Sequence, residues 1–153
     1  MNLSDLLNNL MIEKVASNAE EINNKMEIAI RDVRLARKHL DPNDPDEWDG
    51  AYNTAFNAML QAGTALMGKK GYRPKGREHH YAVTQCVAIL YPTQFSTSLL
   101  AVFEKARQRR NTASYFESGT VSFTQAETIV TKAEEFIDIT IKTLGLPLKR
   151  RAP

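Results

Sequence analysis

The sequence predicts an all-α protein, folded as a largely up-and-down bundle of five to six helices. Apolar residues recur at helical spacing along most of the 153 residues. Helix-start and helix-stop signals separate these segments, and no segment has the alternating pattern of a strand. The length suits one domain, which we place at residues 1–148, followed by a short basic tail at 149–153 that we expect to be disordered.

Two helices are expected in the first forty residues. Residues 1–17 read as a short leading helix with leucines on one side. Asn18 then supplies a break or an N-cap. The second helix follows with an apolar face that continues to Leu40, and Pro42 lies just beyond its end.

The central packing helix is expected to follow. Asp44 is placed to cap it, Pro45 suits its first turn, and Glu47 completes a capping box. The segment is strongly apolar and rich in alanine and glycine, which permit close contacts between helices, and it ends near Gly68. We therefore expect the other helices to pack around it.

The connection at residues 69–80, KKGYRPKGREHH, has the composition of a loop and the charge of an anion-facing one. Its candidate anion-binding residues are Arg73, Lys75, Arg77, His79 and His80. The two histidines suit general acid or base chemistry because histidine titrates near neutral pH, and a capping or packing role is the alternative. No cluster of Cys, Asp or Glu completes a coordination shell with them, so we expect neither a metal nor a cofactor.

Three further helices complete the chain. A short apolar helix at residues 81–91 contains the single cysteine, Cys86, which we expect to be a buried structural thiol. The next helix is expected at residues 93–114. Ser122 and Gln125 form a capping box at the start of the last helix.

The composition is that of an ordinary globular protein, with 42% hydrophobic and 25% charged residues. No run of 18 apolar residues is present, so we expect neither a membrane span nor a secretion signal, and we place the protein in the cytoplasm. The net charge of +2 is too small to indicate nucleic-acid binding by itself.

The segment at residues 107–116, RQRRNTASYF, carries the main functional signal. Arg107, Asn111 and Tyr115 lie four residues apart and share one helix face, with Arg110 to the side. Guanidinium groups are always charged and offer paired planar donors, so this surface, with Arg109 beside it, suits a phosphate. The alternative is that these arginines only offset the negative end of the helix dipole.

This segment and its surroundings resemble the HEPN superfamily, all-α domains that include prokaryotic ribonuclease toxins. The family signature is an Arg, usually followed by a polar residue, then four to six residues and a His. Arg110-Asn111 matches the first half, whereas Tyr115 stands where the His is expected. The stretch AYNTAFNAMLQAGTALMGKKGYRP also resembles the corresponding HEPN helix, so the resemblance covers about residues 20–144.

The resemblance implies a metal-independent endoribonuclease. Two chains would pair so that their Arg motifs face each other in a basic cleft, and a nucleotidyltransferase-type antitoxin would be the partner. Arg110, Asn111 and Tyr115 would form the catalytic set, in which Arg110 binds the scissile phosphate and Asn111 positions it.

Tyr115 is the departure from the family pattern. A tyrosine with a pKa of about 10 is roughly 0.1% ionised at pH 7 and makes a poor general base. Either His79 or His80 supplies the base, or catalysis is weak, or the site only binds. The alternative function is therefore a non-catalytic HEPN module that binds nucleotide, RNA or a partner protein. The resemblance also implies that Tyr115 is placed to accept a nucleotidyl group from a nucleotidyltransferase-type partner.

Overall fold

The computed structural model describes residues 1–116 and 121–150, with side chains described at 1–110 and 121–150. The elements in chain order are α1 (Leu3–Asn8), β1 (Ile12–Lys14), α2 (Ala19–Lys38), the 3-10 turn η1 (Pro45–Glu47), α3 (Trp48–Lys69), β2 (Tyr72–Pro74), α4 (His79–Leu90), α5 (Thr97–Phe116) and α6 (Phe123–Leu144). The predicted all-α class is confirmed.

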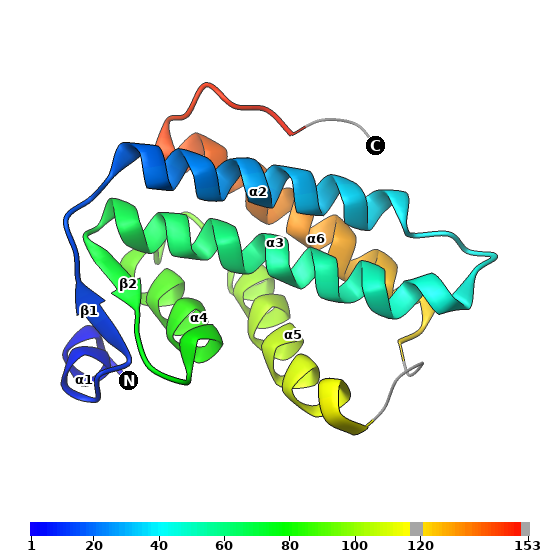
Figure 1. Ribbon diagram of the computed structural model, residues 1–153, viewed down its shortest axis with the longest axis horizontal. Helices are drawn as coiled ribbons and strands as arrows, with labels where there is room; N and C mark the ends of the chain where they lie inside the picture. The colour runs from blue at the N-terminus through cyan, green and yellow to red at the C-terminus, as the bar shows by residue number, and fades with distance from the viewer. Residues whose placement is uncertain (117–120, 151–153) are drawn as a thin grey trace.

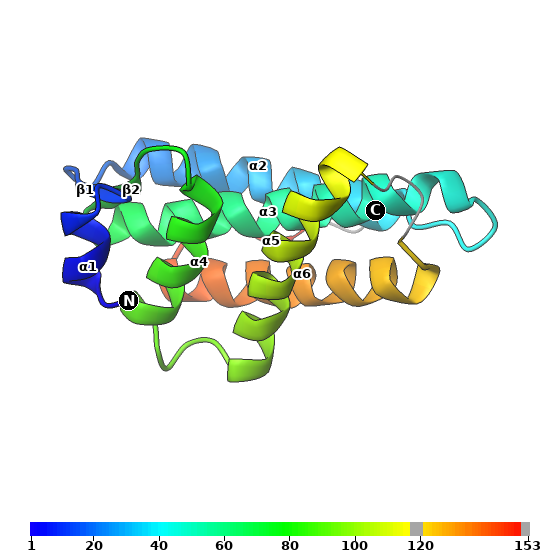
Figure 2. The same cartoon turned by 90° about the horizontal axis from the view of Figure 1, so that it is seen from below.

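The three longest helices form the body of the molecule. α2, α3 and α6 run alongside one another, and α4 and α5 cross them on one side (Figures 1 and 2). α3 contacts α2, α4, α5 and α6, as expected of the central packing helix. Its buried residues include five alanines, whose small side chains let the neighbouring helices approach closely.

Three aromatic rings in contact hold α5 against α3 and α6. Phe56 of α3, Phe103 of α5 and Phe136 of α6 are all fully buried. The ring centroids of Phe56 and Phe103 lie 6.0 Å apart, and those of Phe103 and Phe136 lie 5.2 Å apart. Such pairs contribute about 0.5–1.5 kcal/mol each beyond their buried area. The helix that carries the arginine motif is therefore anchored one turn before Arg107.

The expected leading helix was wrong beyond Asn8. Leu10 adopts a left-handed backbone with φ of 57°, which ends the helix. β1 then pairs antiparallel with β2, with Ile12 opposite Pro74. The segment predicted as a loop therefore contains a strand. Each strand is only three residues long and its partner is distant in sequence, so neither shows a local strand pattern.

The helix boundaries agree with the capping signals except in a few places. The capping box of Ser122 and Gln125 is present, and Asn18 caps α2. Asp44 makes no side-chain cap hydrogen bond; Pro45 instead begins a 3-10 turn that leads into α3. α5 starts four residues later than expected, where the Ser96 hydroxyl accepts a hydrogen bond from the backbone N–H of Leu99.

The beginning of the expected tail contacts α6. Arg150 donates hydrogen bonds to Asp138 at 3.1 Å and to Glu134 at 3.4 Å, both on α6. Glu134 also accepts a hydrogen bond at 2.6 Å from Arg37 of α2. These contacts tie the C-terminal segment to two helices, while residues 151–153 lie outside the described part of the chain.

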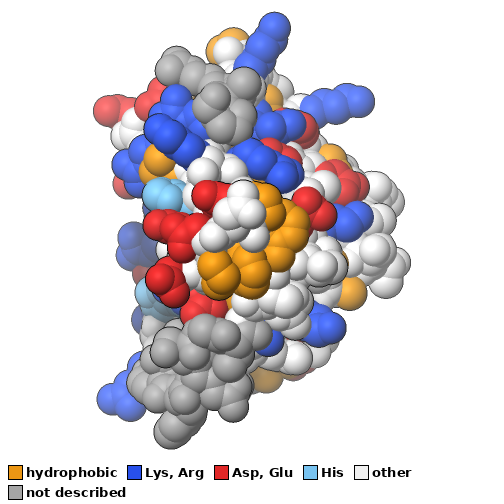
Figure 3. Space-filling model, turned by 90° about the vertical axis from the view of Figure 1, so that its right-hand side faces the viewer, with side chains coloured by type: hydrophobic (Ala, Val, Ile, Leu, Met, Phe, Trp, Pro, Cys, Tyr) orange, Lys and Arg blue, Asp and Glu red, His pale blue; other side chains and the backbone are white. Residues whose placement is uncertain are grey.

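The end of the molecule around the α2–α3 connection is rich in acidic residues. The seven residues from 41 to 47 include four carboxylates: Asp41, Asp44, Asp46 and Glu47. Trp48 and Phe123 meet edge to face at 5.8 Å beside them. Figure 3 shows hydrophobic side chains near the centre of this face with acidic side chains next to them. This end is therefore poorly suited to a polyanion.

No helix in the described ranges is long and apolar enough to cross a membrane.

Gly63 lies where α3 meets α4 and α5. A Cβ added there would lie 2.5 Å from Val83 Cγ1, 3.3 Å from Val87 Cγ2 and 3.7 Å from Phe103 Cε2. Val83 is β-branched and stiff, so its methyl group cannot easily move away. The absence of a side chain at position 63 thus sets how closely α4 approaches α3.

We expect Gly63→Ala to lower the free energy of unfolding by about 1–3 kcal/mol, the usual cost of overpacking a core. Gly50→Ala is a matched control in the same helix, because nothing lies within 4 Å of its added Cβ. That variant should gain about 0.5–1 kcal/mol from the helix preference of alanine over glycine. Urea unfolding followed by circular dichroism measures both. Equal gains in the two variants would contradict a tight contact at Gly63.

Candidate functional site

The three arginines of α5 point to different neighbours. Each guanidinium lies over the ring of a different aromatic residue: Arg107 over Tyr81 at 5.2 Å, Arg109 over Tyr52 at 5.6 Å and Arg110 over Phe56 at 5.7 Å. Arg109 lines a separate pocket that it shares with residues of α6. Only Arg107 and Arg110 therefore belong to the side of the molecule that carries the histidines.

Arg110 is held against α3. Its Nη1 donates a hydrogen bond to the side-chain oxygen of Asn57, and its guanidinium packs on the ring of Phe56. A guanidinium has five N–H donors, and this bond uses one of them. The contacts with α3 thus orient Arg110, and other N–H donors of its guanidinium remain to bind an anion.

His80 contacts the same aromatic ring as Arg110, that of Phe56. It belongs to the first turn of α4 and meets Phe56 edge to face, with ring centroids 5.7 Å apart. Burial lowers the pKa of His80, and electrostatic interactions with Arg110, His79 and Arg107 lower it further. The imidazole is therefore neutral at pH 7 and has one nitrogen that can accept a proton.

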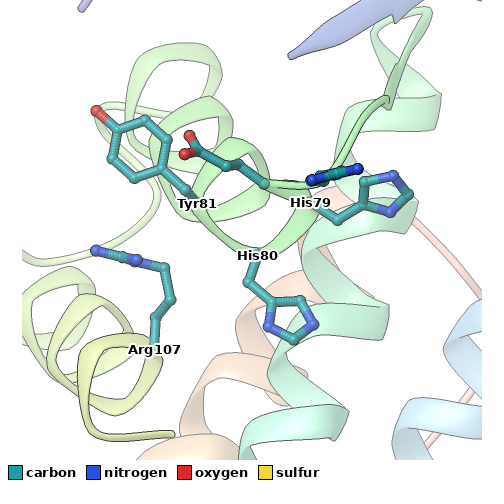
Figure 4. Close-up of a pocket in the computed structure, with 6 residues that line it drawn as sticks. His79, His80, Tyr81 and Arg107 are labelled. Atoms are coloured by element: carbon teal, nitrogen blue, oxygen red, sulfur yellow. The ribbon is translucent and has the colours of Figure 1, made fainter. Parts of the chain in front are cut away.

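The structure separates the two candidate histidines. His80 is half-buried beside the arginines, whereas His79 is exposed. Figure 4 shows the two side chains leaving the first turn of α4 in different directions, with Arg107 reaching from α5 toward Tyr81. His80 is accordingly the better placed of the two to serve as a base near Arg110.

Arg107 is paired within a hydrogen-bonded network. Its Nε and Nη2 donate to Glu104 Oε1 at 3.0 and 2.5 Å, and the Thr84 hydroxyl donates to Glu104 Oε2 at 2.8 Å. Burial alone would raise the pKa of Glu104, but the hydrogen bonds from Arg107 and Thr84 outweigh it and the pKa is lowered. The ionised carboxylate fixes Arg107, offsets much of its charge and links α4 to α5.

A pocket of about 380 Å³ opens between α4 and α5 (Figure 4). Its lining comprises Arg77, Glu78, His79, His80, Tyr81 and Arg107. The N-terminus of α4 lies at this pocket, and no described side chain caps it. Helix N-terminal N–H groups and the positive end of the helix dipole favour anions. The pocket therefore combines Arg77 and Arg107 with a helix N-terminus and suits a phosphate group. Arg110 does not line the pocket but interacts electrostatically with His80, which does.

The remaining predicted residues lie outside this pocket or outside the described side chains. Arg73 Nε donates to Glu13 Oε1 at 2.5 Å, and Lys75 Nζ lies 3.5 Å from Glu13 Oε2, so one carboxylate of β1 pairs with both. The hydrogen bond from Arg73 lowers the pKa of Glu13 most. Asn111 and Tyr115 belong to α5, but their side chains are not among those the structure describes.

Several residues of the site carried no strong sequence signal. Asn57 and Phe56 contact Arg110 across 53 and 54 positions of the chain, so no local pattern indicates them. Glu104 could have been found, because an acidic residue three positions before an arginine on a helix is a neighbour. Among the described side chains, no group of three or more His, Cys, Asp or Glu could hold a metal ion.

Cys86 takes no part in this site. It is fully buried, and burial raises the pKa of its thiol to about 11. The thiol therefore stays protonated and inert at neutral pH, which confirms the expected buried structural role.

The chain matches no known protein-family model, and no curated protein matches it. The resemblance of the α5 motif to the HEPN superfamily accordingly remains a hypothesis, and functional inference depends on the site itself.

We predict that His80 titrates below its ordinary pKa of 6.5. Arg110→Met should raise the pKa of His80, because a nearby cation that disfavours protonation is lost; the value should stay below 6.5, because burial is the larger cause. Side-chain NMR across a pH series measures it.

Arg31→Met is the matched control for this titration. Arg31 pairs with Asp32 on α2 and is not among the charges that act on His80, so its loss should leave the pKa unchanged. A His80 that titrates at or above 6.5 in the native chain would contradict the buried position beside the arginines.

Proposed function

We propose that the protein is a metal-independent endoribonuclease of the HEPN type. The observation that carries the proposal is the position of Arg110 and His80, which pack on the same Phe56 ring and interact electrostatically. A phosphate-binding cation and a neutral imidazole are the two groups that cleavage by the ribose 2′-hydroxyl needs. In this arrangement His80 takes the place of the base that the motif lacks at Tyr115.

The reaction can be followed atom by atom. Arg110 and the N-terminus of α4 hold the scissile phosphate, with Arg107 at its edge. Neutral His80 takes the proton from the 2′-hydroxyl as the 2′-oxygen forms a bond to phosphorus. The bond from phosphorus to the 5′-oxygen breaks, and that oxygen takes a proton from solvent. The products are a 2′,3′-cyclic phosphate and a free 5′-hydroxyl, and no metal is needed.

We expect Arg110→Ala to slow RNA cleavage by about a hundredfold to a thousandfold, the cost of removing one preorganised group from a developing oxyanion. His80→Ala should slow it by about a hundredfold or more through the loss of the base. The control Arg31→Ala removes a distant arginine and should cleave normally. Purified variants are incubated with total RNA in EDTA, and growth is followed on expression in bacteria. Cleavage that survives Arg110→Ala would contradict the proposed site.

The same model makes a prediction about pH. Cleavage requires His80 to be unprotonated, and its folded-state pKa lies below 6.5. The rate of cleavage should therefore hold as pH falls through 6.5 and decline only at the lower folded-state pKa. A rate that already falls by half above pH 6.5 would show that a different group is the base.

We further propose that two chains form the active unit, with a nucleotidyltransferase-type antitoxin as partner. The support is the HEPN resemblance, in which the motif helices of two chains face each other in a basic cleft. Sedimentation at micromolar concentration should give a dimer. A monomer under these conditions would rule out a cleft shared between two chains, without affecting the site within one chain.

A second candidate function is a non-catalytic HEPN module that binds nucleotide, RNA or a partner protein. Two observations favour it: Tyr115 replaces the motif His, and Glu104 and Glu13 already pair with Arg107, Arg73 and Lys75. Such a module would bind RNA in a manner that depends on Arg110 and leave it intact. RNA binding without cleavage in the experiment above would select this function.

A further inference from the structure

A second groove adjoins the pocket of His80. It has a volume of about 550 Å³ and lies between α2, α3 and β2. His79 lines both the groove and the pocket, so the two cavities meet at that side chain. Arg73 also lines the groove and Arg77 lines the pocket, so each of the two cavities has an arginine in its lining.

The chemistry of this groove differs from that of the phosphate pocket. Asn24 and Gln61 line it, and neither side-chain amide makes a hydrogen bond to another residue in the described part of the chain. Each amide offers both a donor and an acceptor. The partly buried ring of Tyr72 lines the groove as well. Donors and acceptors next to an aromatic ring are the features with which proteins bind unstacked nucleobases.

Two other polar side chains of the groove, those of Asn18 and Thr64, already make hydrogen bonds within the protein. The Asn18 side chain accepts a hydrogen bond from the backbone N–H of Glu21, and the Thr64 hydroxyl donates to the carbonyl of Leu60 at 2.8 Å. Glu21 and Lys25 also line the groove and place one acidic and one basic side chain there. The amides of Asn24 and Gln61 are the neutral groups that offer both a donor and an acceptor to a ligand. They lie on α2 and α3, two of the elements that line the groove.

We propose that this groove binds one nucleobase of a single-stranded RNA whose neighbouring phosphate occupies the His80 pocket. The base stacks on Tyr72 and hydrogen-bonds to Asn24 and Gln61. The ribose–phosphate backbone passes His79 between the two cavities. This inference rests on the proposed function, since it assigns a phosphate to the His80 pocket, and it adds the nucleotide contact that would position the strand there.

The test is equilibrium binding of two fluorescent oligonucleotides measured by anisotropy. One is a mixed-sequence 2′-fluoro RNA, which cannot be cleaved because it has no 2′-hydroxyl. The other has the same backbone and length but abasic residues throughout. The native chain should bind the base-containing strand about fivefold to a hundredfold more tightly, since stacking a base on an aromatic side chain contributes about 1–3 kcal/mol.

Variants of Tyr72 and Gln61 identify the groove as the source of this preference. Tyr72→Leu removes the aromatic ring and should reduce the preference for bases about tenfold, whereas Tyr72→Phe keeps the ring and should preserve it. Gln61→Met keeps the length of the side chain without the amide and should lower the preference severalfold. Thermal unfolding confirms that each variant is folded.

The outcomes separate this inference from the proposed function. Equal affinity for both strands, or a base preference that persists in Tyr72→Leu and Gln61→Met, overturns the nucleobase groove. If both strands lose affinity equally in Arg110→Ala, the phosphate site is supported whatever the groove does. A base preference that depends on Tyr72, together with unchanged affinity of both strands in Arg110→Ala, supports the groove and contradicts the phosphate site. Failure of both strands to bind overturns both.

Discussion

The close contact of α4 and α5 with α3 at Gly63 determines where the candidate site forms. Because Gly63 has no side chain, Val83 of α4 can approach α3 closely, and Phe103 of α5 lies within ordinary contact distance of the same turn. His80 lies three residues before Val83, and Arg107 lies four residues after Phe103, so each is about one helical turn from the contact. Phe56 lies two turns before Gly63 on α3, where it meets both His80 and Arg110. Helix packing therefore positions His80, Arg107 and Arg110, while the connection before α4 adds Arg77 and Glu78 to the pocket.

The long helices could be predicted from the sequence because their signals are local. Helical apolar spacing and side-chain caps such as Ser122 lie within a few residues of the elements they define. The strands β1 and β2 could not be predicted, because each is stabilised by a partner about 60 residues away, as the Glu13–Arg73 pair shows. The arginine motif was visible as a motif, but the direction of each arginine depends on distant aromatic rings. Only the Glu104–Arg107 pair was readable from spacing.

Charge compensation divides the basic residues into two groups. Arg73 and Lys75 share the Glu13 carboxylate, and Arg107 is paired with Glu104, so these cations contribute less to the local potential than the sequence suggests. Arg110 is oriented by a neutral amide, that of Asn57, and keeps its full charge. Among the neighbouring groups, Arg110 is the largest electrostatic cause of the lowered pKa of His80.

The position of His80 also bears on the missing histidine of the motif. A general base must lie close to the ribose hydroxyl, and it must be unprotonated. Neither requirement depends on which helix carries the base. On α5, a base would follow Arg110 by a few residues; on α4, His80 reaches the neighbourhood of the same arginine from the facing helix and is kept neutral by burial. In the proposed function, His80 on the facing helix therefore supplies the base that the motif lacks along α5.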